Sequence, residues 1–117
     1  MKGRITVITF VHTWDMASLA QINFLIPMAK RDGHLVNYIA IVVQPMSEKV
    51  LAEMYRDKLQ IPFPVGLLGE DHAQKVSPFG SLDTIPMLVL LDRGGRIVWV
   101  KAGVAQSKEI RNHMRAL

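Results

Sequence analysis

The amino-acid sequence predicts an α/β fold in which helices flank a central four-stranded mixed β-sheet. Three observations support this class: an apolar N-terminal strand that runs into a helical pattern, an almost unbroken run of Val, Ile and Ala, and paired glycines between two late apolar segments. With 117 residues, the chain is expected to be a single domain, 1–117. A chain of this size buries roughly two thirds of its unfolded surface without a disulfide or a metal.

The first three elements are a strand over 4–11, a helix over 17–31 and a strand over 35–43. Apolar residues lie nearly all round the helix, which is typical of a helix buried against a sheet. Pro27 lies inside it, and a proline there removes one backbone hydrogen bond and kinks the axis. The second strand has the composition of a strand covered on both faces, so we expect it to pair in parallel with the first.

The middle of the chain predicts a second helix after a turn at 44–46. Ser47 is its expected N-cap, and the helix should end at Leu59. Its predicted apolar face consists of Val50, Leu51, Met54 and Tyr55. The segment 61–65 is expected to be extended because it contains two prolines.

The C-terminal part predicts a short helix over 70–79, a hairpin and a last helix. The hairpin joins strands at 87–92 and 97–101 through a turn at 93–96, where Gly94 and Gly95 are adjacent. Ser107 is a possible cap for the last helix, which should end at Ala116.

Charge and hydropathy argue against two function classes. Lys and Arg exceed Asp and Glu by four (14 against 10), but the basic residues do not alternate with aromatic ones as a reader of single-stranded nucleic acid requires. The longest apolar runs, 39–43 and 87–91, are far shorter than the ~20 residues that span a bilayer. We therefore expect no nucleic-acid partner and no transmembrane segment. The first residues show no signal-peptide pattern, which leaves a cytoplasmic protein or an excised domain of a longer one.

The chain contains no cysteine. Disulfides, thiolate metal sites and all thiol-based mechanisms are therefore excluded. His12 and Asp15 are three residues apart and are candidate metal ligands, but they flank a strand-to-helix turn, and the remaining histidines fall in unrelated segments. Glu70, Asp71 and His72 are expected to form a solvated loop. We expect no metal site and no cofactor.

The turn between the first strand and the first helix reads Trp14, Asp15, Met16, Ala17, Ser18. A carboxylate and a hydroxyl at a helix start accept hydrogen bonds from unpaired backbone amides and complement the helix dipole. Ser18 and Gln21 also have the spacing of a capping box. These residues predict a local structural role. The alternative is a non-thiol catalytic group at Asp15 or Ser18, with His12 as the third candidate.

The stretch from Phe10 to Ser18 resembles the active-site turn of the bacterial TlpA/ResA-like (AhpC/TSA, redoxin) branch of the thioredoxin-like superfamily, which typically reads Phe-Trp-Ala-Thr-Trp-Cys-Pro-x-Cys. Phe10, Thr13 and Trp14 are in register with it. Ile85-Pro86 before a strand and Leu-Leu-Asp-Arg-Gly-Gly-Arg-Ile-Val-Trp in the hairpin extend the resemblance over nearly the whole chain. It implies a thioredoxin fold with the order βαβα, short helix, ββα. The family's N-terminal hairpin is missing, which fits an excised domain.

The resemblance also implies that redox chemistry has been lost. In that family two cysteines exchange disulfides, and a glutamate three residues after the second cysteine commonly assists proton transfer. Here Asp15 and Ser18 stand at the cysteine positions, and Gln21, which cannot titrate, stands at the glutamate position. We therefore expect a redox-inactive relative with no catalytic residue rather than a variant oxidoreductase.

Ile85-Pro86 matches the family's cis-proline position, where the backbone beside the active-site turn pairs with an extended peptide. The plainer alternative is a turn before a strand. The resemblance predicts a shallow apolar groove, approached by residues 104–106 and bordered by Trp14, Met16, Ile85 and Pro86.

The sequence thus favours a non-enzymatic domain that binds a protein or peptide in this groove. Two alternatives stay open: non-thiol catalysis at Asp15 and Ser18, and a purely structural module of a larger protein. The resemblance suggests a periplasmic or otherwise extracytoplasmic location.

Overall fold

The computed structural model describes residues 3–44, 46–68 and 85–117, and these contain five strands and three α-helices. The strands are β1 (Ile5–Val11), β2 (Val36–Val43), β3 (Val65–Leu68), β4 (Met87–Leu91) and β5 (Ile97–Ala102). The helices are α1 (Met16–Asp32), α2 (Lys49–Leu59) and α4 (Ser107–Arg115), and a 3-10 helix, η1 (Met46–Glu48), precedes α2. The short helix expected over 70–79 lies outside the described residues.

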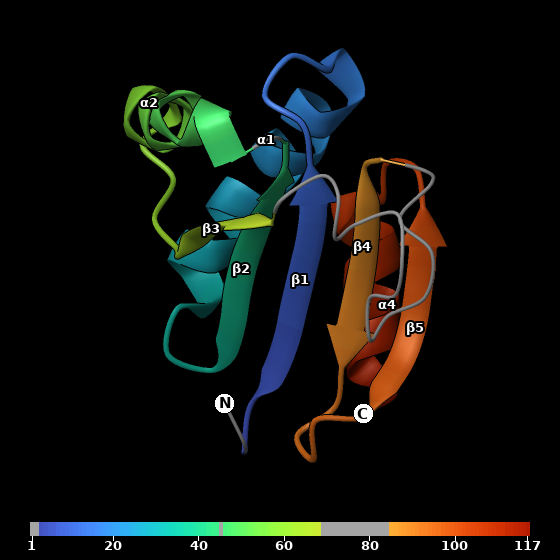
Figure 1. The fold of residues 1–117 in the computed structure, drawn as a ribbon. Coiled ribbons are helices and arrows are strands. Elements are labelled where there is room, and N and C mark those ends of the chain that lie inside the picture. The colour runs from blue at the N-terminus through green and yellow to red at the C-terminus, as the bar shows by residue number, and fades with distance from the viewer. Residues whose placement is uncertain (1–2, 45, 69–84) are drawn as a thin grey trace.

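The strands form one mixed sheet in the order β3-β2-β1-β4-β5 (Figure 1). β1 pairs in parallel with β2, and β2 pairs in parallel with β3. β4 is antiparallel to both of its neighbours, β1 and β5. The predicted α/β class and mixed sheet are confirmed, and β3 joins the four strands that the sequence indicated. The prolines before it hid this short strand, although the Pro64 carbonyl already accepts a hydrogen bond from the Ala40 amide at 3.0 Å.

Each face of the sheet buries its own apolar cluster, because successive side chains of a strand point to opposite faces. On one face, Val7 and Leu88 pack with the helices, which contribute Ile22, Ala52 and Ile110. Figure 1 shows α1 and α4 behind the sheet in this arrangement. The opposite face buries a second cluster that consists of Ile8, Phe10, Val43, Met87 and Val89. Every residue of β1 is buried, as expected of the central strand.

Helix α1 starts one residue before the predicted helix and ends one residue after it. It continues through Pro27, which is exposed and therefore lies on its outer side. The inner side is formed by residues at helical spacing, including Ile22, Leu25 and Met28, which are nearly inaccessible to solvent. No helix in the described part of the chain is long and apolar enough to cross a lipid bilayer.

Two expectations for α2 are wrong. Its N-cap is Glu48, with no side-chain capping bond, because the 3-10 helix η1 takes up Ser47. The buried contact of α2 is Ala52, whereas the predicted apolar face has exposed fractions of 64% at Val50, 47% at Leu51 and 58% at Met54. Of that face, only Tyr55 packs against the core. The reason is that α2 packs beside the edge strand β3, where a small side chain suffices for close contact.

The predicted hairpin turn between β4 and β5 is confirmed. The Asp92 carboxylate accepts hydrogen bonds from the Gly94 and Arg96 amides, both at 2.9 Å. Gly95 has φ +82°, a conformation that side-chain-bearing residues rarely adopt. The positive φ of Gly95 thus explains why the paired glycines predicted this turn.

Candidate functional site

The candidate site lies where β1 ends, at the upper edge of the sheet in Figure 1. β1 and β2 run in parallel, so both strands finish at this edge. β4 runs the other way, and Met87 at its start stands opposite Phe10 near the end of β1. The turn over 12–15 and the Ile85-Pro86 dipeptide therefore meet at one edge. In α/β sheets, ligand sites are commonly found at the carboxyl ends of the strands.

Asp15 and Ser18 hold the start of α1. Asp15 is the N-cap, and its carboxylate accepts a hydrogen bond from the Ala17 amide at 2.9 Å. The Ser18 hydroxyl is fully buried, donates to the Asp15 carboxylate at 3.3 Å and accepts from the His12 amide at 3.1 Å. Asp15 thus satisfies a backbone amide that the helix itself cannot pair, and Ser18 satisfies the His12 amide just after β1.

Gln21 does not form the predicted capping box with Ser18. Its side-chain amide is fully buried and makes two hydrogen bonds to the main chain of Ala105: Nε2 donates to the carbonyl at 3.1 Å, and the Ala105 amide donates to Oε1 at 2.7 Å. Ala105 lies between β5 and α4. Gln21 therefore ties α1 to the segment before α4.

The turn is also hydrogen-bonded to the end of β2 and to Gln44, which follows it. His12 Nδ1 donates to the Val43 carbonyl at 2.7 Å, and the Thr13 amide donates to Gln44 Oε1 at 2.6 Å. Gln44 is fully buried, and its Nε2 donates to Glu48 at 2.9 Å. His12 thus acts as a structural donor. Among the described residues, no group of three or more His, Asp or Glu side chains is arranged to hold a metal ion.

The outward side of the same turn is apolar and exposed. Trp14 is 61% exposed and Met16 is 78% exposed. The Trp14 ring stacks on the His12 ring, with centroids 4.6 Å apart and planes 10° from parallel. Across the edge, Ile85 is half-buried and Pro86 is buried, and the peptide bond between them is cis.

Comparison with known proteins addresses the fold. No family model matches this sequence, and no curated protein sequence matches it. Among solved structures, StoA from Bacillus subtilis matches with a TM-score of 0.79 and 19% identity, covering 97% of this chain and 84% of its own. A thiol:disulfide interchange protein from Chlorobium tepidum matches with a TM-score of 0.81 and 18% identity, covering 98% of this chain and 80% of its own. The fold of this chain is thioredoxin-like.

A third thioredoxin-like structure, a DsbF homologue from Corynebacterium diphtheriae, matches with a TM-score of 0.80 and 16% identity over 99% of this chain and 73% of its own. The likeness to such structures agrees with the TlpA/ResA-like resemblance seen in the sequence. Within this fold, the chain has no Cys-x-x-Cys redox site, since it has no cysteine.

Tyr55 belongs to this region, although its sequence pattern indicated only packing. Burial, and then the negative charge of Asp15, raise the pKa of the Tyr55 hydroxyl to about 12. The hydroxyl is buried and has no hydrogen-bond partner among the described residues. The contribution of Gln44 was not predicted from the sequence either. A polar residue directly after the apolar run of β2, at the edge where β1 also ends, is the sequence feature that could have indicated it.

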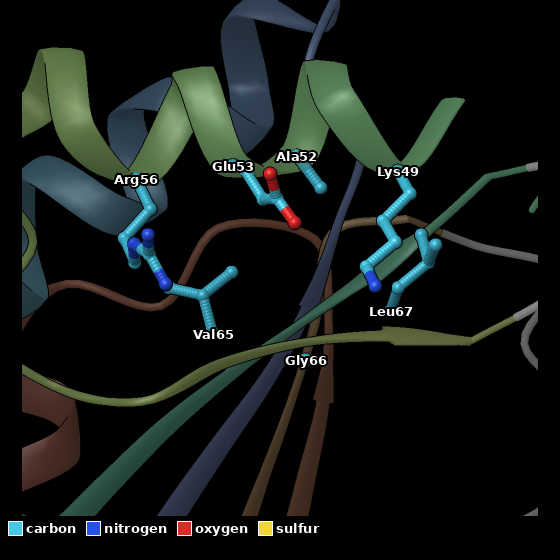
Figure 2. A pocket seen from close by; sticks show the side chains of 7 residues that line it. All are labelled: Lys49, Ala52, Glu53, Arg56, Val65, Gly66 and Leu67. Carbon is cyan, nitrogen blue, oxygen red and sulfur yellow. The ribbon is translucent and has the colours of Figure 1, made fainter. Parts of the chain in front are cut away.

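A separate pocket lies between α2 and the edge strand β3 (Figure 2). Figure 2 shows the side chains of Lys49 and Arg56 extending from α2 toward β3, with Glu53 between them. All three are exposed, and Arg56 forms an exposed ion pair with Asp57 at 3.1 Å. This pocket therefore offers a solvated charged rim and no buried polar group.

Proposed function

We propose that this thioredoxin-like chain binds an extended protein or peptide segment at the edge formed by Trp14, Met16, Ile85 and Pro86, without catalysing a reaction. The observation that carries the proposal is the high exposure of Trp14 and Met16 on a turn whose backbone is held rigidly from beneath. Large apolar side chains grouped on a soluble surface mark interaction sites. A rigid backbone lowers the entropy cost of binding.

The main chain at this edge supports recognition by backbone pairing. Ile85 lies just before β4, and its amide and carbonyl form no hydrogen bond within the described part of the chain. The Pro86 carbonyl is already used, because it accepts a hydrogen bond from the Gly103 amide at 2.8 Å. An extended peptide can pair with free main-chain groups of this kind while exposed apolar side chains contact its own side chains.

The inner side chains support a role without catalysis. A nucleophile needs a nearby general base and access to its substrate. Ser18 is fully buried, and its hydroxyl donates to the carboxylate of Asp15, which also caps α1. Both groups are therefore engaged in holding the turn.

Trp14 fluorescence offers a direct test. A Trp99→Phe background leaves Trp14 as the only tryptophan, since the chain has two. Titration with S-alkylated insulin B chain, an extended peptide without free thiols, should give a saturable change in emission. Met16→Ala should weaken binding by roughly fivefold, which corresponds to about 1 kcal/mol.

The matched control for Met16→Ala is Leu35→Ala. Leu35 is 76% exposed but lies between α1 and β2, at the other end of the sheet. It should leave the affinity unchanged. The proposal fails if the emission does not saturate, or if both variants weaken binding equally.

A further inference from the structure

A second cavity lies at the end of the sheet opposite the candidate site and has a volume of about 260 Å³. The start of β1, the end of α1, the hairpin and α4 converge there, at the lower end of the molecule in Figure 1. Its lining includes Asp32, Leu35, Arg93, Arg111, Met114 and Arg115. The cavity thus combines guanidinium groups with apolar side chains, and it shares no residue with the peptide-binding edge.

Arg111 has more donors than the protein satisfies. Its Nη2 lies 3.3 Å from the Asp32 carboxylate, and the same carboxylate oxygen accepts a hydrogen bond from the Tyr38 hydroxyl at 2.8 Å. Nε and Nη2 of Arg111 are buried and form no hydrogen bond within the described residues. A guanidinium carries five N–H donors, and leaving buried donors unpaired costs free energy. The Arg111 side chain as a whole is 24% exposed and lines the cavity, so an acceptor there can approach the part of the guanidinium that is open to solvent.

The charges of the lining do not balance. Arg93 and Arg115 are exposed, and neither forms an ion pair with a described acidic residue. Together with Arg111 they supply three positive charges, against one negative charge from Asp32, which leaves a local excess of two. The ligand that neutralises such a cavity is a dianion.

We propose that this cavity binds a phosphate monoester. The phosphoryl group carries a charge of about −1.5 to −2 at neutral pH and has three strong acceptor oxygens, which suits convergent guanidinium groups. Arg93, Arg111 and Arg115 bind the phosphoryl group, and the organic substituent lies against the apolar side chains of Leu35 and Met114. Two sources present this chemistry: a small soluble monoester, and the headgroup of phosphatidic acid in a bilayer.

The experiment uses NMR to follow the arginine Nε–H signals of the full chain during titration with butyl phosphate. The proposal predicts saturable shifts. The double variant Arg93→Ala/Arg115→Ala removes two exposed side chains and should weaken binding at least tenfold. Lys49→Ala/Arg56→Ala, which removes two exposed positive charges at α2, should leave the affinity within about twofold, because only nonspecific electrostatics would respond to it.

A parallel arm measures co-sedimentation with vesicles that contain phosphatidic acid, against vesicles of phosphatidylcholine alone. Binding of butyl phosphate supports the site with a soluble ligand. Binding confined to phosphatidic acid vesicles, and lost in Arg93→Ala/Arg115→Ala, supports the site with the lipid headgroup as its ligand. The proposal is overturned if neither probe binds, or if the two double variants weaken binding equally. Loss of peptide binding at Trp14 would not affect this result, so the two proposals fail separately.

Discussion

The inner and outer sides of the turn between β1 and α1 differ in what their side chains contact. On the inner side, Ser18 and Gln21 are fully buried, Ser18 accepts a hydrogen bond from the His12 amide just after β1, and Gln21 is hydrogen-bonded to the distant backbone of Ala105. On the outer side, Trp14 and Met16 are largely exposed. The difference indicates that the inner residues stabilise the fold, while the outer residues are free to contact a partner. Substitutions on the two sides should therefore separate stability from binding.

The largest effect is expected at Gln21. Gln21→Ala leaves the Ala105 amide and carbonyl unpaired in a buried place and creates a cavity. We expect the free energy of unfolding to fall by about 3 kcal/mol, since each unsatisfied buried group costs roughly 1–3 kcal/mol. Urea denaturation followed by circular dichroism measures this loss.

Gln21→Met is the control, because it keeps most of the side-chain volume and removes only the hydrogen bonds. It should still lose about 2 kcal/mol. If Gln21→Met were as stable as the wild type, the paired hydrogen bonds to Ala105 would not be what ties α1 to the segment before α4.

A smaller loss is expected at the helix cap. Asp15→Ala removes the carboxylate that accepts from the Ala17 amide, and such caps contribute about 1 kcal/mol. Asp15→Asn keeps an acceptor oxygen at the same place and should restore most of the stability. The same denaturation experiment compares the two variants. An equal loss in both would show that the negative charge, rather than the cap, is what matters.

Tyr55→Phe should stabilise the protein. It removes a buried hydroxyl without a partner among the described residues, and we expect a gain of up to about 1 kcal/mol at pH 7. Because the folded-state pKa of Tyr55, about 12, lies above its ordinary value of 10.0, the neutral phenol is favoured by folding. The wild type therefore loses free energy of unfolding as the pH rises from 10 toward 12, because Tyr55 ionises in the unfolded state but stays neutral in the folded state.

The advantage of Tyr55→Phe over the wild type should therefore widen above pH 10, which denaturation midpoints across an alkaline series would show. Tyr38→Phe serves as the contrast. Burial, and then the hydrogen bond to Asp32, also raise the pKa of Tyr38, but its hydroxyl has a partner at 2.8 Å. That variant should lose stability at pH 7. A loss in both variants would mean that the Tyr55 hydroxyl is satisfied in solution.

The smallest effect on stability is expected at Trp14. Because its side chain is 61% exposed, Trp14→Ala should change the free energy of unfolding by less than about 0.5 kcal/mol. Calorimetric titration with the alkylated insulin B chain should nevertheless show a clear loss of affinity. A large loss of stability would instead mean that Trp14 stabilises the fold, as the inner residues of the turn do.

The sequence predicts the fold well where the determining contacts are local. Asp15 as a cap and Gly95 in the hairpin turn both follow from their immediate neighbours. The predicted capping box between Ser18 and Gln21 failed because Gln21 bonds instead to the Ala105 backbone, which comes next to α1 only when separate elements are assembled. Ser18 does accept a hydrogen bond from a backbone amide, that of His12, as a local structural role predicts. Capping-box spacing alone could not reveal these partners.

The apolar residues of α2 show a second limit of prediction from the sequence. Val50, Leu51 and Met54 have helical spacing, yet they are exposed because α2 packs beside an edge strand. The strand responsible, β3, is short and follows Pro62 and Pro64, so its pattern suggested only extended chain. The absence of a Cys-x-x-Cys redox site follows from the sequence alone, since the chain has no cysteine. The contributions of Gln44 and Tyr55 depend on tertiary contacts.

The most direct test of the central claim, a thioredoxin-like scaffold that keeps its peptide-binding edge without redox chemistry, is insulin-disulfide reduction in dithiothreitol. The wild type is compared with Asp15→Cys/Ser18→Cys. In the wild type the Asp15 carboxylate and the Ser18 hydroxyl lie 3.3 Å apart at the start of α1, so cysteines at these positions would be neighbours where a helix N-terminus favours a thiolate. Asp15→Cys alone is the control, because it has no second thiol to release the substrate. The account predicts that only the double variant exceeds the rate of dithiothreitol alone. Activity in the wild type, or none in a correctly folded double variant, would contradict it.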